Sequence, residues 1–262
     1  MSNNPFEVHG VDYLSPSSIN KFAQSPAKWL TNLAGYKDQL YIPAFTNGNA
    51  IELGITHACM TDASVAECID VAMEEFQRIR QKVKDIDYHY DLTGCNKKQL
   101  RAADVLQTII PQFKELGTPV AAQKWVEWDF EDLPIPIRGI LDLEYENFVR
   151  DIKTTSVKPK NNANYNRQLT FYALATDKTP KLDYVYTLAK SCELISFDIQ
   201  NINKNIDDIK RIANKMMRML SVSSDIEEVC YLSCLEPNIS NDNWYDQWGT
   251  NEIIGAKKLF NL

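Results

Sequence analysis

Two aspartates and a lysine stand at positions where they could share one chemical task. Asp142 ends the run GILD, and Asp151 and Lys153 lie two residues apart in the run DIKTT. Carboxylate oxygens suit Mg²⁺ and Mn²⁺, which are hard cations. The three residues predict a divalent-ion site beside a fixed positive charge. The alternative is a surface hairpin that carries a solvated aspartate–lysine pair.

A hairpin of two predicted strands must position these residues. Residues 138–145 and 148–154 alternate apolar and polar side chains, which is typical of strands with one buried face. Glu146 and Asn147 supply a polar turn between the two runs. The sequence therefore predicts a tight antiparallel hairpin in which the numbers of paired residues sum to 293.

This register places Asp142 directly opposite Asp151. Side chains in that relation have Cβ atoms about 4.5–5.5 Å apart, and two like charges so placed destabilise a sheet unless a cation lies between them. Lys153 returns to the same face as Asp151, because side chains alternate along a strand. The opposite face of the hairpin is apolar and is predicted to face the core: Leu141, Leu143 and Ile152.

At these residues the chain resembles a known family. GILD at 139–142 and DIKTT at 151–155 are similar to the second and third motifs of the PD-(D/E)XK nuclease superfamily, in its RecB-like and lambda-exonuclease-like branch. That branch also has a GxxH motif before the core and a QxxxY motif after it. GITH at 54–57 matches the first, and Gln168 with Tyr172 matches the second. The resemblance implies an α/β fold with a restriction-endonuclease-like core, a central mixed β-sheet flanked by helices.

The resemblance also implies a role for each residue at the centre. His57, Asp142, Asp151 and the backbone carbonyl of Ile152 would hold one or two Mg²⁺ or Mn²⁺ ions. Lys153 would orient or deprotonate the attacking water, or neutralise charge that develops on the phosphate. The expected reaction is therefore metal-dependent hydrolysis of a phosphodiester bond.

Two further residues complete the expected set. Gln168 and Tyr172 lie four residues apart on a predicted helix, so they share one face. The resemblance assigns the pair to positioning DNA or the active-site lysine, and the alternative is an amphipathic helix with a partly buried tyrosine.

Glu52 competes with His57 for the position near the metal. The two residues project about 140° apart on a helix, so they should not bind the same ion. We choose His57 because it matches the GxxH motif.

Composition places the chain among ordinary globular proteins. It has 262 residues, a net charge of −7 and 44% hydrophobic residues. The acidic charge argues mildly against a protein that coats nucleic acid, but active-site carboxylates contribute to it. Some relatives carry an iron–sulfur cluster on four cysteines. Ser25 stands where they have the first cysteine, and only Cys230 and Cys234 lie near the end, so no cluster is expected.

The predicted organisation is a single nuclease domain over residues 1–262. Its expected parts are a mainly helical segment at 1–120, a catalytic sheet core at 121–200, and a helix with a tail at 201–262. Residues 1–13 are expected to form a loose arm, and Asn47 is a candidate cap for the helix that carries His57. Other helices are predicted at 17–33, 64–83, 96–116, 163–175 and 202–220, and other strands at 125–130, 182–190 and 192–200.

The function expected from size and resemblance is that of a stand-alone DNA exonuclease in recombination, repair or phage DNA processing. DNA is the expected partner, with a recombination or replication protein as a second one. No apolar run suits a membrane span, and a cytoplasmic location is expected. An endonuclease with the same site stays open, as does a catalytically inactive nuclease-fold module that binds DNA or a protein.

Overall fold

The chain divides into two compact units in a computed structural model that describes residues 4–38, 43–84, 92–188, 190–239 and 248–262. Unit 1 comprises Met1–Leu40, Glu127–Gly139 and Asn201–Leu262. Unit 2 comprises Tyr41–Val126 and Ile140–Gln200. Each unit is therefore assembled from separate stretches of the sequence.

One mixed sheet organises the fold. Its strands lie in the order β1-β2-β3-β4-β5. Strands β2 and β3 pair antiparallel, β3 and β4 parallel, and β4 and β5 antiparallel. This confirms the predicted α/β class with a central mixed sheet flanked by helices. The strands are β1 (Ala121–Trp128), β2 (Ile137–Glu144), β3 (Phe148–Thr155), β4 (Thr179–Thr187) and β5 (Cys192–Asp198).

The β2–β3 hairpin has the predicted register. Leu143 pairs with Arg150, and Glu144 with Val149, so the residue numbers of each pair sum to 293. At the turn, the backbone N–H of Tyr145 donates to the carbonyl of Phe148 over 2.8 Å. A regular hairpin with this register places Asp142 and Asp151 opposite each other.

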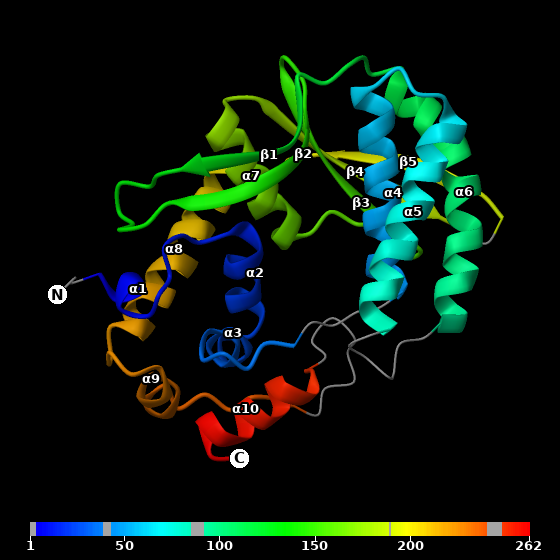
Figure 1. The fold of residues 1–262 in the computed structure, drawn as a ribbon. Helices are drawn as coiled ribbons and strands as arrows, with labels where there is room; N and C mark the ends of the chain where they lie inside the picture. The colour runs from blue at the N-terminus through cyan, green and yellow to red at the C-terminus, as the bar shows by residue number, and fades with distance from the viewer. Residues whose placement is uncertain (1–3, 39–42, 85–91, 189, 240–247) are drawn as a thin grey trace. The chain divides into compact units, whose positions relative to one another are not determined.

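Three helices of unit 2 cover one face of the sheet. They are α4 (Pro43–Met60), α5 (Val65–Lys84) and α6 (Leu92–Lys114), and Figure 1 shows them side by side. Gly54 of α4 permits their close approach, because a Cβ atom there would lie 3.1 Å from Ala72 Cβ and from Leu106 Cδ2. The core between helices and sheet is apolar and includes Ile51, Ile55, Ile109, Phe113, Leu143, Ile152 and Val185.

Helix α7 (Ala163–Thr176) lies on the other face. Ile152 packs into the core beneath α4 and α6, whereas the preceding residue, Asp151, is hydrogen-bonded to Gln168 of α7. Successive side chains of a strand point to opposite faces, so α7 covers the face that carries Asp151. The helix begins where the side chain of Asn162 accepts from the N–H of Tyr165, which is a typical N-cap.

Unit 1 is helical apart from its share of β1 and β2. The prediction of a loose arm at residues 1–13 is wrong for the described part of that segment, because Pro5–Val8 form helix α1 and Phe6 is fully buried. The single helix predicted at 17–33 is two helices that meet at Ser25, since Pro26 starts a new helix. The helices are α2 (Pro16–Gln24), α3 (Pro26–Leu33), α8 (Ile202–Leu220), α9 (Ile226–Leu232) and α10 (Thr250–Phe260).

Other expectations about the elements need smaller corrections. Asn47 is no cap, because α4 has already begun at Pro43 and Asn47 is buried inside it. Strand β1 begins at Ala121, four residues earlier than predicted, and α6 begins at Leu92. Across the described parts of the chain, no helix has both the length and the apolar character that crossing a bilayer requires.

Candidate active site

The structure brings Asp142, Asp151 and Lys153 together, as the hairpin register predicts. Lys153 Nζ lies 2.6 Å from Asp151 Oδ2 and 4.0 Å from Asp142 Oδ2. The backbone N–H of Ile152 donates to Asp142 Oδ2 over 2.6 Å. Asp151 is 1% exposed and Asp142 is 6% exposed. Two carboxylates and one ammonium group therefore lie in a largely buried cluster on the α7 side of the hairpin.

Gln168 and Tyr172 join this cluster through helix α7. Gln168 Nε2 donates to Asp151 Oδ1 over 2.9 Å and to the hydroxyl oxygen of Tyr172 over 3.0 Å. The Tyr172 hydroxyl in turn donates to the carbonyl of Ile140 over 2.6 Å. These bonds link α7 to both strands of the hairpin. Gln168 contacts the carboxylate of the DxK motif, whereas the resemblance suggested DNA or the lysine as its partner.

Glu52 also belongs to the cluster. The side-chain amide of Gln123 donates to Glu52 Oε1 over 2.9 Å and approaches Asp142 Oδ1 at 3.4 Å. Gln123 comes from β1 and Glu52 from α4. The sequence indicates Glu52 as a competitor of His57, but no sequence pattern points to Gln123.

His57 lies elsewhere on α4. Five residues separate it from Glu52, which turns it about 140° around the helix axis. On its side of the helix it lies near Glu67 of α5. In the part of the chain that the structure describes, no contact joins His57 to Asp142 or Asp151. Burial of Ile51 and Ile55 fixes the rotation of α4, so the structure brings Glu52, and not His57, to the carboxylates.

Burial makes the carboxylates of the cluster weaker acids. It raises the pKa of Asp142 to about 6, with a further contribution from Glu52 and an opposing one from Lys153. It raises the pKa of Asp151 to about 7, where Lys153 opposes and Asp142 adds to the effect. The pKa of Glu52 is also raised, again mainly by burial. A single lysine therefore does not compensate for the burial of the three acidic groups.

Lys153 stays a cation in this environment. Burial alone would lower its pKa, but the adjacent carboxylates of Asp151 and Asp142 outweigh burial and raise the pKa above its ordinary value. The pKa of Tyr172 is raised by burial and then by the charge of Asp151. Lys153 and Tyr172 are therefore hydrogen-bond donors at neutral pH.

The chemistry of the donor groups fits a divalent cation. With all three acids ionised, Glu52, Asp142 and Asp151 exceed the charge of Lys153 by two, and hard oxygen ligands suit Mg²⁺ or Mn²⁺. The Ile152 carbonyl lies 3.2 Å from Lys153 Nζ. Yet no three His, Cys, Asp or Glu side chains among the described residues are close enough to enclose an ion. In this arrangement Lys153 and the Ile152 N–H contact the carboxylate oxygens instead.

A buried ion pair supports the sheet beside the cluster. Arg150 Nη1 lies 2.6 Å from Asp183 Oδ2, and the hydroxyl of Ser196 donates to Asp183 Oδ1 over 2.5 Å. Asp183 has no exposed surface and Arg150 is 8% exposed. The pair connects β3 to β4 one residue away from Asp151. The sequence does not predict this pair, because no local pattern links positions 33 residues apart.

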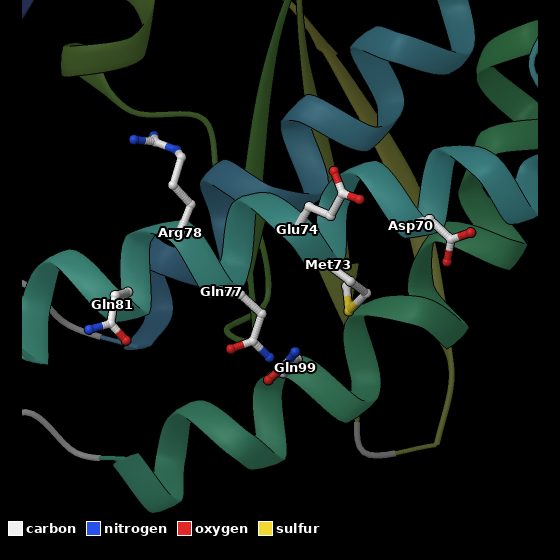
Figure 2. Close-up of a pocket in the computed structure, with 7 residues that line it drawn as sticks. All are labelled: Asp70, Met73, Glu74, Gln77, Arg78, Gln81 and Gln99. Atoms are coloured by element: carbon white, nitrogen blue, oxygen red, sulfur yellow. The ribbon is translucent and has the colours of Figure 1, made fainter.

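A separate hollow of about 720 Å³ lies between α5 and α6. Gln77 of α5 and Gln99 of α6 both line it, as Figure 2 shows. None of its lining residues belongs to the carboxylate cluster: Asp70, Met73, Glu74, Gln77, Arg78, Gln81 and Gln99. The hollow is therefore not part of the candidate site.

Comparisons with known proteins bear on the family and the fold of this chain. The family model described as the PD-(D/E)XK nuclease superfamily matches residues 13–230. A crystal structure of a "putative exonuclease" from Eubacterium rectale is similar in fold, with a TM-score of 0.51, 11% identity, and coverage of 82% of this chain and 86% of that one. The crystal structure of SSO0001 covers 76% of this chain and 98% of its own at 16% identity, with a TM-score of 0.33. No curated protein sequence matches the chain.

Proposed function

The chain belongs to the PD-(D/E)XK nuclease superfamily, and we propose that this protein is a divalent-metal-dependent DNA exonuclease. The family generally uses divalent metals such as Mg²⁺ or Mn²⁺. The observation that carries the proposal is the buried cluster in which Lys153 lies beside Asp151 and Asp142. Catalytic need is the simplest reason to keep such a cluster, because burying an excess of carboxylates costs stability.

Each residue of the cluster has a role in this proposal. Asp142, Asp151, Glu52 and the carbonyl of Ile152 are the groups that would hold the cation. A bound divalent ion would polarise the scissile phosphate and lower the pKa of a water molecule. Lys153 keeps its proton, so it contributes positive charge near the phosphate and hydrogen bonds that orient the water.

Helix α7 holds the acidic groups in place. Gln168 fixes one oxygen of Asp151, while Lys153 contacts the other. Tyr172 ties the same helix to the Ile140 carbonyl on β2. Residues held in this way keep the geometry that hydrolysis needs, and small displacements of such groups reduce rates strongly.

We propose that the protein acts as an exonuclease in recombination, repair or phage DNA processing. The similarity in fold to the protein named as an exonuclease agrees with it. His57 is kept in the proposal only as a ligand for a second ion, because the side-chain amide of Gln123 joins Asp142 to Glu52 and not to His57. We propose a cytoplasmic location, as DNA is the expected substrate.

A cleavage assay tests the proposal. Linear single-stranded and duplex DNA, labelled at either end, is incubated with the protein beside closed circular DNA, in Mg²⁺, Mn²⁺ or EDTA. We expect metal-dependent loss of linear DNA only, and no activity in the Asp151→Asn variant. Cleavage of closed circular DNA would show that the protein is an endonuclease and not an exonuclease. Binding of DNA without cleavage in either metal would overturn the enzymatic proposal in favour of an inactive module.

A further inference from the structure

Gln123 occupies an irregular point in strand β1. Its φ is +48°, in the left-handed region that residues other than glycine rarely adopt. Among the described residues, four others that are not glycine also have a positive φ. Three of them are Asp or Asn residues at the ends of helices, and the fourth is Cys234, which lies in a turn. Gln123 differs because it lies inside a strand and has a long side chain. Such backbone strain costs stability and is commonly found at functional sites.

The irregularity turns two consecutive side chains to the same side. Gln123 contacts Asp142, and Lys124 contacts Glu144 at 2.7 Å. Asp142 and Glu144 are two residues apart on β2, so they point to one face. In a regular strand, residues 123 and 124 would point to opposite faces. The backbone therefore forms a bulge, and bulges re-aim side chains next to active sites.

The re-aimed amide lies between two acidic groups. Gln123 Nε2 is 2.9 Å from Glu52 Oε1 and 3.4 Å from Asp142 Oδ1. A primary amide has two N–H donors, so it can hold both carboxylates without neutralising either. Lys153 differs in this respect, because its positive charge offsets part of the charge of Asp151 and Asp142. Gln123 thus keeps two negative groups together while their charge stays available to a cation.

We infer that Gln123 is a positioning residue that holds Glu52 beside Asp142 as a ligand pair for the divalent cation. This inference rests on the proposed metal-dependent function. Gln123 is itself exposed, and its side-chain amide contacts these two carboxylates. Its amide is therefore not needed to fill the core, and the strained backbone serves the arrangement of the acidic pair.

Two substitutions separate positioning from a structural role. Gln123→Gly relieves the backbone, because glycine adopts positive φ freely, and it removes the amide. Gln123→Asn also accepts this conformation and keeps an amide, but the side chain is one methylene too short to reach both carboxylates. Lys124→Met is the matched control, since Lys124 is the next residue on β1 and contacts Glu144 instead.

The test is calorimetric titration of the full chain with Mn²⁺ at pH 8, combined with thermal unfolding of the metal-free protein. Both Gln123 variants should bind Mn²⁺ about 10- to 100-fold more weakly, the usual effect of removing a group that orients metal ligands. Their metal-free melting temperatures should equal or exceed that of the wild type. Lys124→Met should bind Mn²⁺ as the wild type does.

The other outcomes are equally decisive. Unchanged Mn²⁺ affinity in both Gln123 variants would overturn the inference and leave the proposed function intact. Weaker binding accompanied by lower metal-free melting temperatures in both variants would make the residue structural and also overturn it. If the wild type bound no Mn²⁺, the metal-dependent function would fail, and the inference with it.

Discussion

Gln168 donates a hydrogen bond to Asp151 over 2.9 Å, so helix α7 controls one oxygen of the carboxylate that Lys153 contacts through the other. Both oxygens of Asp151 therefore have assigned neighbours on two different elements. The orientation of this carboxylate depends on the helix as much as on its own strand.

Removal of the Gln168 amide should impair catalysis more than stability. We expect Gln168→Leu to lower kcat about 10- to 100-fold, the usual cost of losing a group that orients an active-site ligand. Tyr172→Phe should have a smaller effect on kcat but should destabilise the fold by about 1–2 kcal/mol, because the Ile140 carbonyl loses its donor. Cleavage kinetics and urea unfolding measure the two effects. Equal losses of stability in both variants, with unchanged kcat, would contradict this division.

The metal-free protein should lose stability as the pH rises from 5 to 8. Folding raises the pKa of Asp142 from 3.8 to about 6, and that of Asp151 from 3.8 to about 7. The folded state therefore binds more protons than the unfolded chain in this range, and stability falls with increasing pH. Above pH 5 the folded state keeps the proton of Asp142 for about one pH unit and that of Asp151 for about two. One unit of pKa corresponds to about 1.4 kcal/mol, so we expect a loss of roughly 4 kcal/mol.

Urea unfolding in EDTA across this pH range measures the loss. The double variant Asp142→Asn/Asp151→Asn should show a much smaller slope and should be more stable than the wild type at pH 8. Added Mg²⁺ should stabilise the wild type more at pH 8 than at pH 5.5, because the ion binds the ionised carboxylates. A wild-type profile without slope would show that the two acids are not buried as described.

Two glycines of helix α4 should respond in opposite ways to alanine. A Cβ at Gly54 would lie 3.1 Å from Ala72, Cys68 and Leu106 atoms, so Gly54→Ala should destabilise the fold by about 1–3 kcal/mol through overpacking. A Cβ at Gly48 would have Thr154 Cβ at 4.0 Å. Gly48→Ala should therefore stabilise the fold by about 0.5–1 kcal/mol through helix propensity. Thermal unfolding of both variants checks the contrast, which a common sign of the two shifts would refute.

The buried pair Arg150–Asp183 should matter far more than an exposed pair on the same sheet. Asp183→Ala leaves the Arg150 guanidinium buried without its carboxylate, and we expect a loss of about 3–5 kcal/mol. Asp198→Ala is the matched control, because its pair with Lys181 is solvent-exposed at 3.2 Å and should contribute less than about 1 kcal/mol. Denaturant unfolding measures both. Similar losses in the two variants would contradict the assigned burial.

Local geometry explains what could be predicted from the sequence. The positions of Asp142, Asp151 and Lys153 follow from strand alternation and from one turn, which are properties of about 15 consecutive residues. The pairing of Gln168 with Tyr172 follows from the helical repeat in the same way. The break at Ser25 could also have been predicted, because proline is favoured in the first turn of a helix.

The rest of the site depends on contacts that no local pattern contains. The angle between Glu52 and His57 is a property of the helix, but the rotation of α4 is set by packing of Ile51 and Ile55 against distant segments. Gln123 adopts a conformation that its residue type disfavours, so propensity argues against it. The Arg150–Asp183 pair requires the parallel register of β3 and β4, which forms only across an intervening helix.

The division of the chain into units has a consequence for how this protein can vary. The polypeptide changes unit after residues 40, 126, 139 and 200, and every residue of the carboxylate cluster lies in unit 2. Neither the two terminal stretches nor the excursion at 127–139 therefore contributes a side chain to the carboxylate cluster. Substitutions confined to those stretches leave the side chains that make up the cluster unchanged.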